Sequence, residues 1–230
     1  MNAVVRDLPF QSFWGQRNYV LSNPWTMTIN EPVGAVLAYL ANLIHLTPNQ
    51  VTFCSLAVSI GGSVGYFFLP KAPISTLLLV FAFQLAYGLD CADGQLARAT
   101  GRASAFGQWL DVAIDFAASI AVPAAMILHA VSQPGWPNPL WYVLAGVALS
   151  YSRVLVLFTY TTQRLQGAQG PREVSLLRKA FRLVTDTGFF LVIIVLARHW
   201  ALVLLGVMFT YSLLHVVTAV YVARRMPRRS

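Results

Sequence analysis

Long stretches of the chain carry hydrophobic side chains with no charged position between them, and they recur from residue 51 onward. The segments 51–69 and 72–89 contain no Asp, Glu, Lys or Arg. Each is close to the ~20 apolar residues that an α-helix needs to cross ~30 Å of hydrocarbon, whereas a helix in a soluble core normally keeps a polar face. Six segments are predicted as transmembrane helices: about 51–69, 74–97, 107–130, 140–163, 183–197 and 200–222.

The segment before the first predicted span has a different character. Residues 31–46 (EPVGAVLAYLANLIHL) place apolar residues at helical spacing, but the stretch is too short to be a span. It is predicted to be an interfacial amphipathic helix on the cytoplasmic leaflet. Because no internal repeat interrupts the pattern, residues 1–230 are expected to form a single all-α integral membrane domain: six transmembrane helices plus this N-terminal interfacial helix.

Charge supports this picture and suggests an orientation. Only 10% of the residues are charged, against ~25% in a typical soluble domain. Of the 16 Lys and Arg residues, 13 lie in the four regions that six spans put on one side, and the other side has only Lys71 and Arg198. The positive-inside rule therefore predicts cytoplasmic termini. The net charge of +8 would then face lipid headgroups, leaving no soluble surface for a nucleic acid.

Four aspartates interrupt the apolar pattern between residues 89 and 116. Asp90 and Asp93 are three residues apart, and Asp111 and Asp115 are four apart, so each pair shares one face of a helix. The short connection 100–104 between them fits an antiparallel turn, which would let the two faces look at each other. Charges within membrane spans are costly and mark functional sites, so a positive partner is expected among these carboxylates.

The surrounding residues indicate which partner this is. Clustered carboxylates suit hard cations such as Mg²⁺ or Mn²⁺, and no paired Cys or His ligands accompany them. Gly94 and Ala97 leave room on the same helix face, and Arg98 can offer a guanidinium fork to a phosphate. Two cations, an arginine and small residues are suited to a diphosphate, whose leaving group the metals would neutralise.

The pattern as a whole resembles a known family. Asp90-x2-Asp93-Gly94-x2-Ala97-Arg98-x8-Gly107-x3-Asp111-x3-Asp115 is similar, without a gap, to the motif of the CDP-alcohol phosphotransferases, integral membrane enzymes of phospholipid synthesis. The resemblance implies that Asp90, Asp93, Asp111 and Asp115 bind two metal ions and that Asp115 is also the base. It further implies a homodimer. The residues implied for binding of the CDP-linked donor are Asn49, Gln50, Val51, Thr52, Gly94, Ala97, Arg98, Ser104 and Gly107.

The acceptor site is less well marked in the sequence. Arg153 has no charged neighbour and is expected to bind the acceptor, with Arg178 and Arg182 as further candidates. Family members that use phosphorylated acceptors often have a second basic residue two positions after the first. Here that position is Leu155, which weakens an assignment to a phosphorylated acceptor. Asp186, four residues after Arg182, is expected to pair with it.

The sequence therefore predicts a membrane enzyme that transfers a substituted phosphate, expected to be phosphatidyl from CDP-diacylglycerol, to a small alcohol with release of CMP. The expected location is a bacterial or archaeal cell membrane, with the site on the cytoplasmic side. A competing hypothesis is a CDP-choline or CDP-ethanolamine enzyme acting on diacylglycerol. Two more hypotheses are a cation transporter that uses the aspartates as its pathway and a structural ion-pair network.

Overall fold

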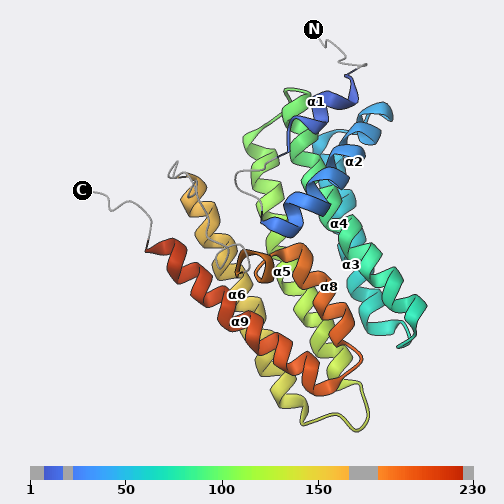
Figure 1. Ribbon diagram of the computed structural model, residues 1–230, viewed down its shortest axis with the longest axis vertical. Helices are drawn as coiled ribbons and strands as arrows, with labels where there is room; N and C mark the ends of the chain where they lie inside the picture. The colour runs from blue at the N-terminus through green and yellow to red at the C-terminus, as the bar shows by residue number, and fades with distance from the viewer. Residues whose placement is uncertain (1–7, 18–22, 166–180, 225–230) are drawn as a thin grey trace.

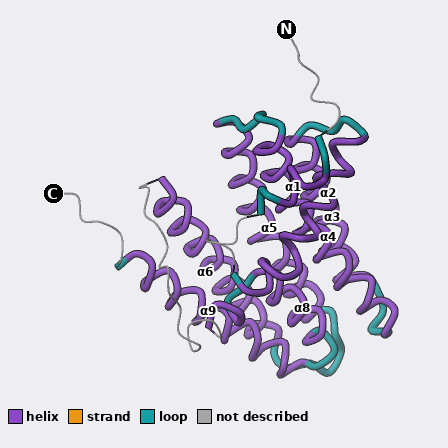
Figure 2. Tube along the Cα trace, turned by 45° about the horizontal axis from the view of Figure 1, so that its top comes forward, coloured by secondary structure: helices purple, strands orange, loops and turns teal. Residues whose placement is uncertain are grey.

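The computed structural model describes residues 8–17, 23–165 and 181–224 of the 230-residue chain. Every regular element in these ranges is helical, as the purple trace in Figure 2 shows. The elements are α1 (Phe10–Trp14), the π-helical η1 (Thr26–Asn30), α2 (Glu31–Leu43), α3 (Pro48–Phe68), α4 (Pro73–Ala99), α5 (Ala105–Val131), α6 (Pro139–Leu165), α8 (Thr187–Ala197) and α9 (Ala201–Ala223). The all-α prediction is confirmed for these residues.

Five helices are long and apolar enough to cross a bilayer: α3, α4, α5, α9 and the Pro139–Thr162 part of α6. They lie where five of the six spans were predicted. The sixth predicted span, 183–197, contains α8, whose 11 residues rise only about 16 Å. Since α8 alone is too short to cross ~30 Å of hydrocarbon, the count of six spans stays a prediction.

Local sequence determines where the helices around the aspartate motif begin. At the start of α3, the Thr47 N–H donates to Gln50 Oε1 at 2.8 Å and the Gln50 N–H donates to Thr47 Oγ1 at 3.3 Å, which is a capping box. At the start of α5, Ser104 Oγ accepts a bond from the Gly107 N–H at 3.0 Å. Gly101 reverses the chain between α4 and α5 with a φ of 66°, which favours glycine.

Small residues allow α2 to pack closely across α4. A Cβ added at Gly34 would lie 2.8 Å from Cys91 Cβ, and one at Gly88 would lie 3.0 Å from a Val33 methyl carbon. The amphipathic helix predicted at 31–46 is not confirmed, because α2 ends at Leu43 and its outward side chains are apolar as well. The exposed residues of α2 are Val33, Val36, Leu40 and Leu43, and the exposed Ile44 follows the helix.

The long helices enclose one extended apolar core. α3 packs against α4 and α5, α6 packs against α5 and α9, and α8 contacts both α4 and α9. Figure 1 shows α6 and α9 running side by side. Large apolar side chains also cover the outside, where Phe81 is 65% exposed and Leu202 is 71% exposed. An outer surface of this kind indicates contact with lipid, in agreement with an integral membrane protein.

Buried hydrogen bonds fasten η1 to both α8 and α4. The fully buried Asp186 caps α8 by accepting a bond from the Gly188 N–H at 2.9 Å. It also accepts bonds from the Thr26 N–H at 2.9 Å and from Thr26 Oγ1 at 2.8 Å. Thr26 Oγ1 in turn lies 3.1 Å from the Tyr87 hydroxyl of α4. Asp186 therefore joins three segments that are distant in the sequence.

The contact between η1 and α8 leaves no room for a side chain at Gly188. A Cβ there would lie 2.5 Å from Asn30 Oδ1 and 2.6 Å from Trp25 Cδ1. Gly188→Ala is therefore expected to destabilise the fold by ~1–3 kcal/mol, the usual range for overpacking, and to lower the midpoint of thermal unfolding in detergent.

Gly206→Ala is the matched control for this substitution. Gly206 is also helical, and a Cβ there would meet nothing within 4 Å. Its midpoint should stay unchanged or rise slightly, because alanine favours helix. Equal midpoints for the two variants would contradict the close packing of η1 on α8.

Candidate functional site

The aspartate motif occupies the last turns of α4 and the first turns of α5. Asp93 is buried, with 6% of its surface exposed, and it is close enough to Asp111 and Asp115 for their charges to interact. The structure thus brings together carboxylates from the two helices, as their spacing predicted. Asp90 lies one turn before Asp93 on α4, and its charge interacts with the thiol of the neighbouring Cys91.

One atom of this group has no bonding partner. Asp93 Oδ2 is buried and accepts no hydrogen bond from the described residues, although the Thr52 side chain of α3 interacts with the same carboxylate. A buried carboxylate without full pairing is costly, so this position favours a cation. Among the described residues, no group of three or more His, Cys, Asp or Glu side chains is arranged around one metal position.

The starts of α3 and α5 meet beside the aspartates. A Cβ added at Gly107 would lie 3.2 Å from Ser104 Oγ and 3.3 Å from Asn49 Oδ1. Glycine at position 107 therefore lets these two polar groups approach each other. They come from helices far apart in the sequence, and both were predicted to contact the donor.

Three other residues predicted for the donor site have structural tasks. Gln50 uses its side-chain oxygen in the capping box with Thr47. Val51 is 1% exposed and belongs to an apolar cluster with Ala92 and Leu96 of α4. Thr52 donates its hydroxyl to the carbonyl of Pro48 at 3.0 Å. Of the three, Thr52 is also near an aspartate of the motif.

Arg98 lies at the end of α4, next to the N-terminal part of the chain. It is exposed, and its Nη2 donates to the carbonyl of Gln16 at 3.0 Å. A Cβ at Gly94 would lie 3.0 Å from Arg98 Nη1, so the glycine gives the guanidinium room to lie along the helix. Ala97 is half-buried beside it.

Arg153 of α6 is the predicted acceptor residue that the structure brings to the motif. Its charge interacts with Asp115, and its Nε is buried with no partner among the described residues. The guanidinium carbon lies 4.8 Å from the centre of the Phe190 ring. Arg182 Nε donates to Asn23 Oδ1 at 3.1 Å, and Arg178 lies outside the described residues.

Residues that were not predicted from the sequence surround Arg153. His215 of α9 is buried, interacts with Arg153, and has no partner for Nδ1 in the described part of the chain. Tyr87 of α4 also interacts with Arg153. A lone histidine in an apolar helix gives no spacing signal, so its place beside Arg153 could only come from the packing of α9 on α6.

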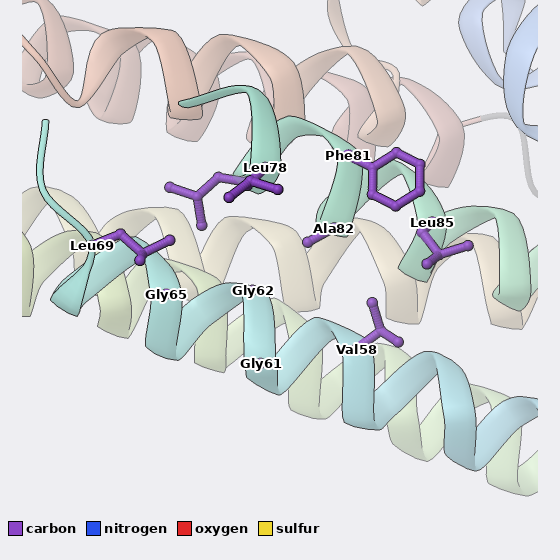
Figure 3. Close-up of a pocket in the computed structure, with 10 residues that line it drawn as sticks. Val58, Gly61, Gly62, Gly65, Leu69, Leu78, Phe81, Ala82 and Leu85 are labelled. Atoms are coloured by element: carbon purple, nitrogen blue, oxygen red, sulfur yellow. The ribbon is translucent and has the colours of Figure 1, made fainter. Parts of the chain in front are cut away.

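The grooves on the outer surface lie away from this polar group. One groove of about 390 Å³ lies between α3 and α4. Figure 3 shows the glycines and large apolar side chains that line it. It borders the halves of these helices that are distant from Asp93. A second groove of about 260 Å³, between α3 and α5, is also mainly apolar. Their linings suit hydrocarbon rather than a charged ligand.

Comparison with known proteins places the motif within a wider similarity. Residues 45–211 match the profile of the CDP-alcohol phosphatidyltransferase family. An archaetidylinositol phosphate synthase of Pyrococcus horikoshii is 32% identical over 126 residues, which are 54% of this chain and 60% of that protein. A bifunctional IPC transferase and DIPP synthase of Aquifex aeolicus is 28% identical over 177 residues, 76% of this chain and 38% of that protein.

The chain thus matches between about two fifths and three fifths of the length of these two curated relatives. Among solved structures, the phosphatidylinositol phosphate synthase of Mycobacterium tuberculosis, crystallised with CDP-DAG bound, has a TM-score of 0.62. That similarity covers 86% of this chain and 99% of the other at 17% identity, and it shows a shared fold. Because the family profile spans most of the chain and includes the whole aspartate motif, the protein belongs to the CDP-alcohol phosphatidyltransferase family.

Proposed function

We propose that the protein transfers a substituted phosphate from a CDP-linked lipid to the hydroxyl of a small alcohol and releases CMP. The observation that carries this proposal is the grouping of Asp93, Asp111 and Asp115 from two neighbouring helices, with the half-buried Arg153 beside them. The family profile covers all four residues. CDP-diacylglycerol is the proposed donor, supported by the solved structure of similar fold that holds CDP-DAG.

Asp90, Asp93, Asp111 and Asp115 are proposed to hold two Mg²⁺ or Mn²⁺ ions. The fit rests on the chemistry of an all-carboxylate set and on the buried Asp93 Oδ2, which accepts no bond from the described residues. When bound, such ions supply neutralisation of the diphosphate charge.

The chain's own residues account for the rest of the reaction. Asp115 accepts the proton of the acceptor hydroxyl while the hydroxyl oxygen forms a bond to the β-phosphorus of the donor. The bond from that phosphorus to the oxygen bridging to CMP breaks, and CMP departs with that oxygen. Arg98 pairs with a phosphate of the donor, and Asn49 and Ser104, whose side chains meet beside Gly107, bind its nucleotide part.

The proposed acceptor is a phosphorylated alcohol, with inositol phosphate as the first to test. Arg153 has an unpartnered buried Nε and lies near Asp115, so its guanidinium can fix an anionic group of the acceptor beside the base. The names of the Pyrococcus horikoshii and Mycobacterium tuberculosis proteins both specify inositol phosphate products. Leu155 in place of a second basic residue leaves Arg153, with His215 nearby, to provide this recognition.

We also propose that the site and both termini face the cytoplasm and that the protein is a homodimer. The orientation is supported by the 13 basic residues on the motif's side of the predicted spans, against two on the other. The homodimer is supported only by the family resemblance.

Asp115→Asn is expected to lower the rate of CMP release by about 10²–10⁴-fold, because asparagine cannot accept the hydroxyl proton. The purified variant should still bind CDP-diacylglycerol, and its unfolding midpoint should match that of the wild type. CMP release is measured with CDP-diacylglycerol, Mn²⁺ and a panel of alcohols. A full rate in the variant would refute the base assignment. Release from CDP-choline with diacylglycerol would move the lipid to the acceptor side.

Mn²⁺ is expected to raise the thermal unfolding midpoint of the wild type, and Asp93→Asn should abolish most of that rise. Removal of divalent ions with EDTA should stop CMP release, and Mg²⁺ or Mn²⁺ should restore it. Asp186→Asn is the control, since asparagine still caps a helix and Asp186 is bonded to Thr26 and Gly188. If both variants keep the full Mn²⁺ response, the aspartate motif does not hold the metal.

Arg153→Gln is expected to raise the KM for a phosphorylated acceptor at least about tenfold and to leave the KM for CDP-diacylglycerol unchanged, because a charge-assisted bond to the acceptor is lost. Arg224→Gln, which removes an exposed arginine at the end of α9, is the control and should change neither constant. Steady-state CMP release measures both values. An Arg153→Gln enzyme with an altered donor KM alone would exclude the acceptor role.

A further inference from the structure

We propose that the protein has a second anion site, on the membrane face opposite the aspartate motif, that binds the phosphate of an anionic phospholipid. This far end of the bundle is formed by the connections between α3 and α4, α5 and α6, and α8 and α9, which lie together at the lower end of Figure 1. The proposal does not depend on the reaction proposed above.

Arg198, which follows α8, is the centre of the proposed site. Its side chain is fully buried, and its Nη2 donates to the carbonyl of Leu69 at 2.6 Å. Its Nε and Nη1 are buried and have no partner among the described residues. The guanidinium carbon lies 5.3 Å from the centre of the Tyr66 ring. A buried guanidinium with unpaired donors is costly, and an oxyanion can accept a bond from Nε or from Nη1.

Further nitrogen-bearing side chains surround this arginine. Arg198 is close enough to Lys71 for their charges to interact, and both residues interact electrostatically with His199. His129 also interacts electrostatically with Arg198 and Lys71. Its Nδ1 is buried and has no hydrogen-bond partner in the described part of the chain. Burial and the charge of Arg198 lower the pKa of Lys71, and burial with both charges lowers the pKa of His199. The lowered pKa favours the neutral form of His199, so the positive charge at this end comes from Arg198 and Lys71.

No acidic residue of the described ranges balances this charge. The closest along its own helix is Asp186, which is 12 residues, or about 18 Å, before Arg198. Lys71 and Arg198 are the only basic residues that the span prediction puts on this side, yet they are neighbours in space. Two cations brought together in a poorly solvated place would repel each other, so the arrangement favours an anion between them.

The depth of the site selects the kind of anion. Lys71 Nζ lies 4.1 Å from the centre of the Trp136 ring, and Trp141 and Trp200 are exposed on the same end of the bundle. Tryptophans gather at the level of lipid headgroups, so these residues place the cationic group beside the phosphates of the leaflet opposite the aspartate motif. Lys71 and His199 are half-exposed and provide the approach to the buried Arg198.

Thermal unfolding of the purified full-length protein tests the proposal. The protein is prepared in a neutral detergent, and mixed micelles with phosphatidylglycerol are compared with micelles containing phosphatidylcholine and with inorganic phosphate in lipid-free detergent. Phosphatidylglycerol is expected to raise the midpoint by about 3 °C or more over phosphatidylcholine, because a ligand that binds only the folded state stabilises it. A similar rise with inorganic phosphate would identify a soluble anion as sufficient and would overturn the assignment to a lipid.

Four variants locate the effect. Lys71→Gln and Arg198→Gln should lose the response to phosphatidylglycerol, while Arg224→Gln and Asp93→Asn should keep it, since they lie at the other end of the bundle. Lys71→Gln decides the test if Arg198→Gln does not fold, because the Lys71 side chain is half-exposed and lies over the face of Trp136. A full response in Lys71→Gln, or its loss in Asp93→Asn, would overturn the proposal.

Discussion

The burial of Asp93 among the carboxylates of α4 and α5 is the constraint on which the site depends. Apolar helices can accommodate several acidic side chains only if positive charge compensates them, and Arg153 from α6 provides part of it. The remaining deficit is visible at Asp93 Oδ2, which no described group satisfies. The fold contributes by packing α3 against both α4 and α5 and by packing α6 against α5, so that compensation can come from several directions. The carboxylates that make the helices costly to insert are thereby the groups that can attract cations.

Much of this arrangement could be predicted from the sequence, because it follows from helical periodicity. The spacings of Asp90 and Asp93, and of Asp111 and Asp115, put each pair on one face, and the glycine turn at Gly101 reverses the chain between them. Five of the predicted spans coincide with long apolar helices. Residue spacing says less about α8, where 11 residues follow a buried cap and crossing depends on what surrounds them.

Long-range contacts account for what could not be predicted. The spacing of Asp186 and Arg182 suggested a local pair, but Asp186 bonds Thr26, 160 residues earlier, and Arg182 Nε bonds Asn23. Similarly, Arg198 was expected only as one of two basic residues on the far side of the membrane, and its complete burial depends on the meeting of three interhelical connections. Helical periodicity could predict neither of these contacts, because the bonded partners lie in different helices or connections. Val51 differs in another way: it was predicted to bind the donor, but its side chain packs in an apolar cluster.

The bond between Arg98 and the carbonyl of Gln16 has a thermodynamic consequence for any phosphate that this arginine receives. The guanidinium already donates a hydrogen bond to this carbonyl. The binding free energy of an incoming anion is therefore the difference between the new bond and the bond that it replaces. A carbonyl is a weaker acceptor than a charged oxygen, and the exchange is favourable but attenuated. Once the anion displaces the Gln16 carbonyl from Arg98, that carbonyl must accept a bond from water or from another donor. Residues outside the motif thus set part of the affinity for a phosphate at Arg98.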